Sequence, residues 1–298
     1  MNASEIAHEL MARPRRNGSG WLVLCPVHGD KRPSLSIREG KDGKILVKCF
    51  SGCEGREILT TLREMGLLDG RTPSRPIPQA PPGNTERQAD RASDLWNEAH
   101  PIESGDPVHK YLTGRGIVLD TWPGDLRSHP ALDYWEPGED GKPVLLGKWP
   151  AMLAVVRSPQ GRPVGLHRTY ITSDGHKAPV PAPKKIMKVH DLSGSAVRLF
   201  TPRDGALAVT EGVEDALSAW ILWQIPAWAT IGTSGLKGFA PPEDVKEILI
   251  LSDNDEPGKR AALELAQRLE EKGKAVRIVT PSGPAKDINQ LLMMECTR

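Results

Sequence analysis

Residues 206–280 alternate short apolar runs with amphipathic stretches, and this alternation restricts the possible fold more than any other feature of the 298-residue chain. The apolar runs read ALAVT, PAWATIG, EILILSD and AVRIVT, and the stretches VEDALSAWILW and GKRAALELAQRLEEKG lie between them. Apolar strands that alternate with helices are typical of a mainly parallel sheet covered on both faces. The order β-α-β-β-α-β therefore predicts an α/β domain, which we place at residues 204–298.

Acidic residues follow two of these strands. Glu211, Glu214 and Asp215 come after ALAVT, and Asp253 and Asp255 come after EILIL. Ligands of parallel sheets bind beyond the carboxyl ends of the strands, so these carboxylates converge if the two strands are neighbours. Clustered carboxylates repel one another and usually share divalent cations, and ligand sets made only of oxygen favour Mg²⁺ or Mn²⁺ over zinc.

Each acidic motif also has a purely structural interpretation. Asp255 could cap the helix that begins near Pro257, and Glu211 could be an exposed turn residue. Either motif taken alone leaves both interpretations open.

The N-terminal region holds three of the four cysteines in the chain, and Cys296 stands apart. Cys25 and His28 form a Cys-x2-His pair, and Cys49 and Cys53 form a Cys-x3-Cys pair. This spacing indicates structural zinc, and a disulfide is disfavoured because no secretory signal precedes it. The runs SLSIRE and KILVKC between the pairs predict a zinc-ribbon-like module over residues 1–70, which needs the metal to fold.

The region between the two domains has two parts. Residues 71–91 are rich in proline and poor in apolar residues, which predicts an extended linker. Residues 92–203 follow as a basic α+β subdomain, with helices expected at 93–102 and 107–117 and a hairpin over 151–172. The overall fold class is therefore α/β, or α+β when all parts are counted.

Positive charge gathers immediately before the acidic domain. Residues 157–203 contain nine Lys and Arg residues and two Asp residues, although the whole chain has a net charge of only +1. This segregation favours a polyanionic ligand, and a solvated basic surface is the alternative.

The two acidic motifs together resemble the Toprim domain. EGVEDAL followed by SDNDEPG carries the resemblance, and ATIGTSGLKGF and KDINQLL extend it. At the last motif Asp287 matches the first of two acidic residues, whereas Asn289 stands at the second. The resemblance implies four catalytic residues and five magnesium ligands. The catalytic residues are Glu211, Asp215, Asp253 and Asp255, and Asp287 joins them as a ligand; Glu211 acts either as a ligand or as the base.

The rest of the chain resembles DnaG-type primases in the same order. The sequences Cys-Pro-x-His, RPSLSI and VKCFSGC are similar to the zinc-binding domain of that family, and YLTGRGI and the hairpin are similar to its polymerase core. The three-residue spacing of the second cysteine pair is similar to primases of phages and integrated elements. The resemblance implies nucleotide or DNA contacts by Arg168, Lys184, Lys185, Lys188 and Lys237. Contacts of the zinc module with single-stranded DNA are expected from Trp21, Lys31, Arg32, Arg38, Lys44, Lys48 and Phe50, although Phe50 could instead pack beneath the zinc.

These features predict a cytoplasmic DNA primase that makes short RNA primers by two-metal nucleotidyl transfer. Single-stranded DNA, NTPs and a replicative helicase supplied in trans are the expected partners, and no membrane association is expected. Two alternatives stay open: a non-catalytic DNA-binding scaffold similar to the recombination mediator RecR, and a Toprim nuclease. A topoisomerase is disfavoured because its tyrosine nucleophile requires a large gate.

Overall fold

The computed structural model describes residues 1–17, 20–28, 30, 33–40, 43–68, 82–138 and 142–296. The chain divides into two compact units, one of residues 1–78 and 135–145 and the other of residues 79–134 and 146–298. The expected boundary at residue 70 and the first part of the expected linker lie outside the described residues. Within the described residues, no helix is both long and apolar enough to cross a membrane.

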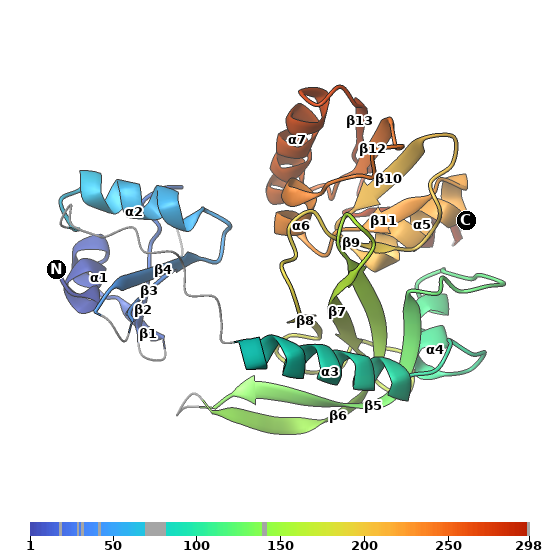
Figure 1. Ribbon diagram of the computed structural model, residues 1–298, viewed down its shortest axis with the longest axis horizontal. Helices are drawn as coiled ribbons and strands as arrows, with labels where there is room; N and C mark the ends of the chain where they lie inside the picture. The colour runs from blue at the N-terminus through green and yellow to red at the C-terminus, as the bar shows by residue number, and fades with distance from the viewer. Residues whose placement is uncertain are drawn as a thin grey trace. The chain divides into compact units, whose positions relative to one another are not determined.

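The first unit contains an antiparallel sheet in the order β1-β2-β3-β4 (Figure 1). Its elements are α1 (Ala3–Leu10), β1 (Arg15–Asn17), β2 (Gly20–Val23), β3 (Leu35–Glu39), β4 (Ile45–Cys49) and α2 (Gly55–Glu64). The expected ribbon strands are β3 and β4, which pair with Leu35 opposite Cys49. A small core that includes Ile6, Leu35 and Ile58 joins the two helices to the sheet.

Within the described residues, the second unit contains one nine-stranded sheet in the order β13-β12-β10-β11-β9-β6-β7-β8, with β5 paired to β6. Its first elements are α3 (Pro82–Glu98), α4 (Pro107–Thr113), β5 (Leu126–Pro137), β6 (Pro143–Arg157), β7 (Pro163–Tyr170), β8 (Lys184–Lys188) and β9 (Ala196–Arg198). The end of β5 and the start of β6, within residues 135–145, are assigned to the first unit. The remaining elements are β10 (Ala206–Thr210), α5 (Val213–Trp223), β11 (Ala227–Ala229), α6 (Thr233–Gly238), β12 (Glu247–Leu251), α7 (Glu256–Glu270), β13 (Ala275–Val279) and α8 (Ile288–Cys296).

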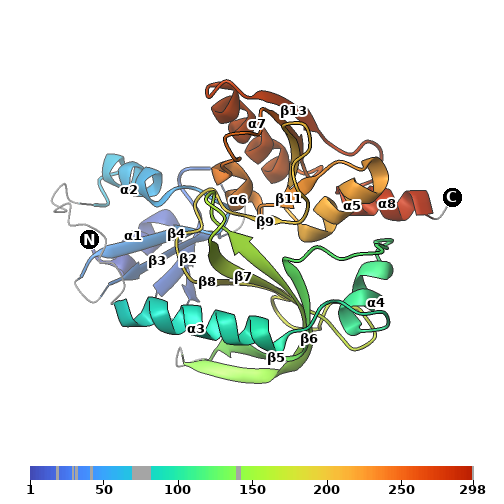
Figure 2. The same ribbon diagram turned by 45° about the vertical axis from the view of Figure 1, so that its right-hand side comes forward.

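The predicted α/β domain is confirmed. Strands β11, β10, β12 and β13 are parallel, and helices cover both of their faces (Figures 1 and 2). On one face Leu217 of α5 and Leu292 of α8 enter the core, and on the other Leu236 of α6 and Leu265 of α7 do so. The short antiparallel strand β9 joins this parallel sheet to the β6–β7 hairpin, so the basic subdomain and the acidic domain share one sheet.

Three local predictions are corrected or refined. Residues 82–91, which we expected to be extended, form the first part of helix α3. The helix expected over 107–117 ends at Thr113, where Gly114 follows as its C-cap. The hairpin over 151–172 is present as β6 and β7, and its turn is closed by the Ser158 amide, which donates to the Arg162 carbonyl at 2.8 Å.

Candidate functional site

The two acidic motifs leave the same edge of the sheet. Strands β10 and β12 are parallel neighbours with Val209 opposite Ile250, so the condition set by the sequence is met. A cavity of about 400 Å³ lies at this edge. Its walls include Glu211, Asp215, Asp253 and Asp287, which are four of the five predicted magnesium ligands.

Burial and mutual repulsion raise the pKa values of three of these carboxyl groups. The pKa of Asp215 rises to about 8 because the group is buried and Asp287 and Asp253 are near. The pKa of Asp253 rises to about 7 through burial and the charges of Glu211, Asp287 and Asp255. Burial and Asp255 also raise the pKa of Glu211. Carboxyl groups that resist ionisation in this way are typical of a site that gains a cation or takes up a proton.

Glu211 is held through one of its two carboxylate oxygens. The Thr233 hydroxyl, at the start of α6, donates to Oε2 at 2.9 Å, and Oε1 is buried without a hydrogen-bond partner. At the neighbouring Gly212 a side chain would displace Asp215, because a Cβ there would lie 2.6 Å from Oδ2 of Asp215. The orphaned oxygen and the close approach of Asp215 fit a site built to receive a cation.

Asp255 has a structural role, as the alternative interpretation proposed. Its Oδ1 accepts the Gly258 amide at 2.7 Å and caps helix α7, and the residue does not line the cavity. Its charge nevertheless acts on Glu211 and Asp253. We therefore assign Asp255 a cap and an electrostatic influence on the cavity, while a metal-ligand role for it remains a prediction.

Asn289 occupies the position where the family pattern has an acid, and the structure explains why an amide fits. Its Nδ2 donates to the Arg115 carbonyl and to the Ser218 hydroxyl, both at 3.0 Å, and its backbone amide donates to Asp215. A carboxylate could make neither side-chain donation. The Oδ1 atom of Asn289 is buried without a partner, and the residue lines the cavity.

An ion pair between an exposed lysine and a buried glutamate holds one cation at the cavity wall. Lys184 of β8 donates from Nζ to Oε2 of Glu214 at 2.8 Å, and the Tyr111 hydroxyl donates to Oε1 at 2.6 Å. Against the effect of burial, Lys184 and Tyr111 hold the pKa of Glu214 far below its usual range. Glu214 therefore stays ionised and links α4, α5 and β8 at the cavity wall.

The predicted basic residues are not all in one place. Lys184 lines the cavity, and so do Arg115 and Lys177, which the sequence did not single out. Lys185 also borders the cavity, but it lies opposite Arg168 in the sheet and its ammonium is 3.9 Å from the centre of the Tyr134 ring. Lys237 pairs with Glu264 of α7 at 2.8 Å, and neither it nor the exposed Lys188 lines the cavity.

Arg168 is separated from the cavity by the sheet itself. The side chain of its neighbour His167 lines the cavity, and because successive residues of a strand point to opposite faces, Arg168 points away from it. Arg168 instead lines a smaller cavity beside α3. A nucleotide contact of Arg168 inside the acidic cavity therefore does not fit this arrangement, whereas a DNA contact of Arg168 stays a prediction.

His167 also lines the cavity, although no motif of the sequence pointed to it. It is buried, and burial and the charge of Lys184 lower its pKa to about 4, so the imidazole is neutral at physiological pH. Its Nδ1 atom has no hydrogen-bond partner. No spacing in the sequence could have identified it, because the residues that surround it in the cavity come from other parts of the chain.

The backbone of the cavity wall is strained at one position. Ile231 adopts a φ of 59° in the loop between β11 and α6, and this left-handed conformation is rare for a β-branched residue. The adjacent Gly232 amide donates to the Glu211 carbonyl at 3.0 Å. Such strain is often found at functional loops, where the surrounding contacts maintain it.

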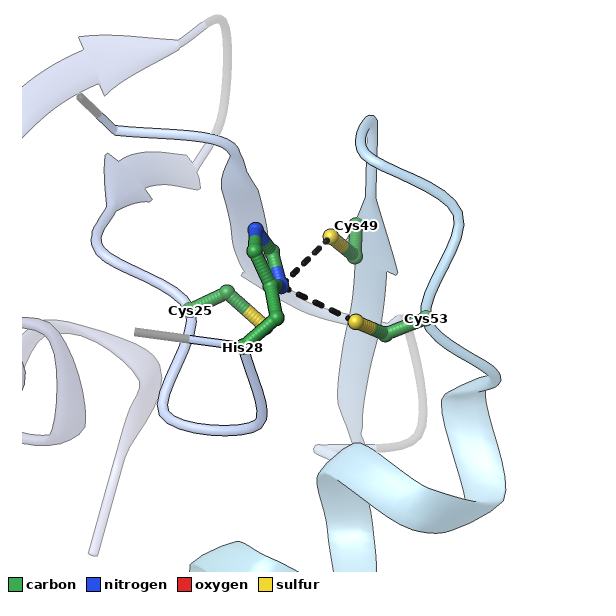
Figure 3. Close-up of side chains that lie close together, drawn as sticks. All are labelled: Cys25, His28, Cys49 and Cys53. Atoms are coloured by element: carbon green, nitrogen blue, oxygen red, sulfur yellow. Dashed lines mark hydrogen bonds between the residues drawn. The ribbon is translucent and has the colours of Figure 1, made fainter. Parts of the chain in front are cut away.

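The Cys/His cluster of the first unit is assembled as predicted (Figure 3). One donor atom each from Cys25, His28, Cys49 and Cys53 lies within 4.8 Å of the others, a set suited to tetrahedral zinc. Within the described residues this is the one group of three or more such donors at this separation, so no three carboxylates of the acidic cavity lie so close together. A cation there would complete its shell with water or substrate oxygens, as Mg²⁺ usually does.

The Asp30 carboxylate contacts two of the zinc-ligand residues, His28 and Cys25. His28 directs Nδ1 toward the Cys53 sulfur at 3.0 Å, and its Nε2 lies 2.5 Å from Oδ1 of Asp30. The other Asp30 oxygen accepts from the Cys25 amide at 3.0 Å and from the Ser34 hydroxyl. This is the carboxylate–histidine arrangement that orients metal-bound imidazoles.

The structure describes some of the residues of this unit that were predicted to contact DNA. Phe50 is 61% exposed with the Lys48 ammonium 5.6 Å from its ring, so it does not pack beneath the zinc. Trp21 instead packs against the core of the unit, with the Arg16 guanidinium 4.2 Å from its ring. Lys31 and Arg32 lie outside the described residues.

Comparisons with known proteins agree with this architecture. Residues 206–297 match the Toprim domain family, and residues 86–199 match a domain of unknown function, DUF7146. The second unit thus contains a Toprim domain. No curated protein matches the chain.

Three solved primase structures are similar in fold. The zinc-binding and RNA polymerase domains of the Aquifex aeolicus primase share 17% identity and a TM-score of 0.47, covering 99% of this chain and 80% of that one. The primase fragment of the bacteriophage T7 primase-helicase shares 16% identity and a TM-score of 0.41, covering 93% and 96%. The RNA polymerase domain of Mycobacterium tuberculosis DnaG shares 17% identity and a TM-score of 0.43, covering 73% and 80%. Likenesses at this level establish no shared activity.

Proposed function

We propose that the protein is a DnaG-type primase that synthesises short RNA primers on single-stranded DNA. One observation carries the proposal: a single cavity joins the Toprim carboxylates to cationic side chains of the neighbouring subdomain. Glu211 and Asp253 supply the acidic wall, and Lys177, Lys184 and Arg115 supply the basic one. A nucleoside triphosphate with bound divalent cations needs both kinds of wall at once, whereas a nuclease or a scaffold has no need of a triphosphate grip.

The carboxylates are suited to hold magnesium or manganese, which when bound would stabilise the attacking and leaving oxygens of nucleotidyl transfer. Asp253, Asp215 and Asp287 would provide ligand oxygens, with Asn289 adding a neutral one through its unpartnered Oδ1. Glu211 would accept at Oε1 either a cation or the proton of the attacking 3′-hydroxyl, and its raised pKa suits both roles. Lys177 and Arg115 would neutralise the triphosphate of the incoming NTP, with a smaller contribution from Lys184, whose charge Glu214 already balances.

The zinc-bearing unit would contribute to template binding. Lys48 lies in β4, and the exposed ring of Phe50 follows directly after the strand. The ring is suited to stack on a base, and the nearby ammonium is suited to contact a phosphate. Zinc itself would act only as a structural cross-link between the two halves of the ribbon. The same proposal includes a replicative helicase that acts in trans with this chain.

The test is a primer-synthesis assay with single-stranded DNA, Mg²⁺ and labelled NTPs. Short RNA products that disappear in Asp253→Asn and persist in the exposed control Asp244→Asn would support the proposal. Cleavage of the DNA without RNA synthesis would favour the nuclease. DNA binding with neither product would favour the scaffold, and either result would overturn the proposal.

A further inference from the structure

Arg168 has no role in the acidic cavity, yet it is partly buried and incompletely bonded. Its Nη1 donates to the Tyr170 hydroxyl at 3.2 Å, and its Nε is buried without a partner. Burial and the nearby charge of Arg91 lower the pKa of Arg168. The protein therefore holds a guanidinium in a place that is unfavourable without a counter-ion.

Several cations converge on this side of the sheet. Helix α3, which lies beside β5 and β6 in both views, contributes Arg91 (Figures 1 and 2). Lys148 of β6 lines the same small cavity, and the Lys185 ammonium lies 3.9 Å from the centre of the Tyr134 ring. The charges of Arg168, Lys185 and Arg91 all act on the Tyr170 hydroxyl.

Two acidic residues also line this cavity, and each already has a basic neighbour. Asp133 pairs with Lys148 at 3.1 Å, and Glu98 lies 3.3 Å from Nε2 of His129. Within the described part of the chain, neither Arg91 nor Arg168 has a carboxylate partner. Two guanidinium groups thus face a cavity of about 120 Å³, which is too small for a whole nucleotide because pockets for such ligands start at roughly 300 Å³.

We propose that Arg91 and Arg168 form a phosphoryl-binding site on the α3 side of the sheet, separate from the acidic cavity. The guanidinium forks suit the oxygens of one phosphoryl group, which would also satisfy Nε of Arg168. The group is either a phosphodiester of single-stranded nucleic acid or inorganic phosphate. The first source deepens the proposed function by adding a strand contact remote from the reaction, and the second is independent of it.

The test compares Arg91→Gln, Arg168→Gln and the double variant with Arg260→Gln, which removes an exposed arginine of α7. Binding of a fluorescein-labelled single-stranded oligonucleotide is measured by anisotropy at several salt concentrations, and binding of inorganic phosphate is measured by calorimetry. We expect each single variant to lower the affinity for one of the two ligands about 3–10-fold, and Arg260→Gln to leave both affinities unchanged. For the oligonucleotide, the slope of log affinity against log salt should also become shallower by about 0.7 for each lost contact.

The outcomes distinguish a nucleic-acid phosphodiester from inorganic phosphate as the ligand, and they test this inference separately from the proposed function. Weaker oligonucleotide binding with unchanged phosphate binding assigns the site to the strand, and the reverse assigns it to free phosphate. Unchanged binding of both ligands in the double variant overturns the inference. Arg168→Lys keeps the charge but loses the fork, so intermediate affinity in that variant shows that loss of binding is not due to misfolding. If the wild-type chain makes no primers while these differences persist, the proposed function fails and the site stands.

Discussion

Replacing Asp253 by Asn should stabilise the protein at neutral and alkaline pH when no divalent cation is present. Burial and the charges of Glu211, Asp287 and Asp255 raise the pKa of Asp253 from 3.8 to about 7. The folded state then binds this proton more tightly than the unfolded state, so stability falls as pH rises from about 4 to about 7 and stays low above that. Asn cannot ionise and removes the penalty.

The size of the effect follows from the same shift. A tenfold change in a protonation equilibrium is worth about 1.4 kcal/mol, so the full shift corresponds to ~4 kcal/mol. Asp253 is only partly buried, and solvent screening reduces the expected gain to ~2 kcal/mol at pH 8. Near pH 4 the gain should vanish. Added Mg²⁺ should narrow the difference at pH 8, because only the wild-type carboxylate gains from it.

Hydrogen exchange is the suitable assay, because it reports on β10 and β12 separately from the zinc-bearing unit. Magnesium is omitted from the buffer rather than chelated, since a chelator would also remove zinc. Asp244→Asn is the matched control, because Asp244 is an exposed acid of the same unit. Equal protection of wild type and Asp253→Asn at pH 8 would refute the reasoning, as would a stabilisation that is independent of pH.

Further predictions test other parts of the structure. Glu214→Gln should lower the free energy of unfolding in urea by ~1–3 kcal/mol, because Lys184 loses the carboxylate that lies 2.8 Å away. Tyr111→Phe should lower it by ~1–2 kcal/mol, because the hydrogen bond to Glu214 is lost. An unchanged free energy of unfolding in both variants would contradict a structural role for these contacts. Asn289→Asp should lower the melting temperature in the absence of Mg²⁺, because two buried hydrogen bonds are lost and a charge is added beside Asp215; unchanged melting would show that the amide is not needed. Removal of zinc should abolish exchange protection of β3 and β4 and leave β10 and β12 protected, and loss in both units would argue against two independent units. Nucleotide affinity should show no histidine titration between pH 5 and 7.5, because the pKa of His167 lies near 4, and a step near pH 6.5 that is absent in His167→Gln would contradict this.

The sequence predicted the acidic site because a general rule connects strand order to ligand position. Once ALAVT and EILIL are neighbours in a parallel sheet, Glu211 and Asp253 must leave the same edge. The zinc ligands could be predicted equally well, because the spacing of metal ligands is a local property of the chain. In both cases, few residues and a short-range rule sufficed.

The failures have a common physical origin in long-range packing. Residues 82–91 contain few apolar side chains and gave no helical pattern, yet they continue into Leu95 and Trp96, which pack on the core beneath α3. The hydrogen bond from Tyr111 to Glu214 joins residues 103 positions apart. The sequence places Arg168 in the correct strand, but only the register of β7 decides which face it occupies.

Lys184 shows why site residues cannot be assigned one at a time. Its ammonium bonds Glu214, partly offsets the rise in the pKa of Asp253, and adds to the effect of burial in lowering the pKa of His167, so one cation influences three groups of the cavity. Because Glu214 already balances its charge, the attraction of Lys184 for an incoming triphosphate is weaker than that of an unpaired lysine. The remaining attraction must come from cations bound at the carboxylates together with Lys177 and Arg115. An anionic substrate should therefore bind this cavity weakly until divalent cations are present, which makes nucleotide and metal affinities mutually dependent.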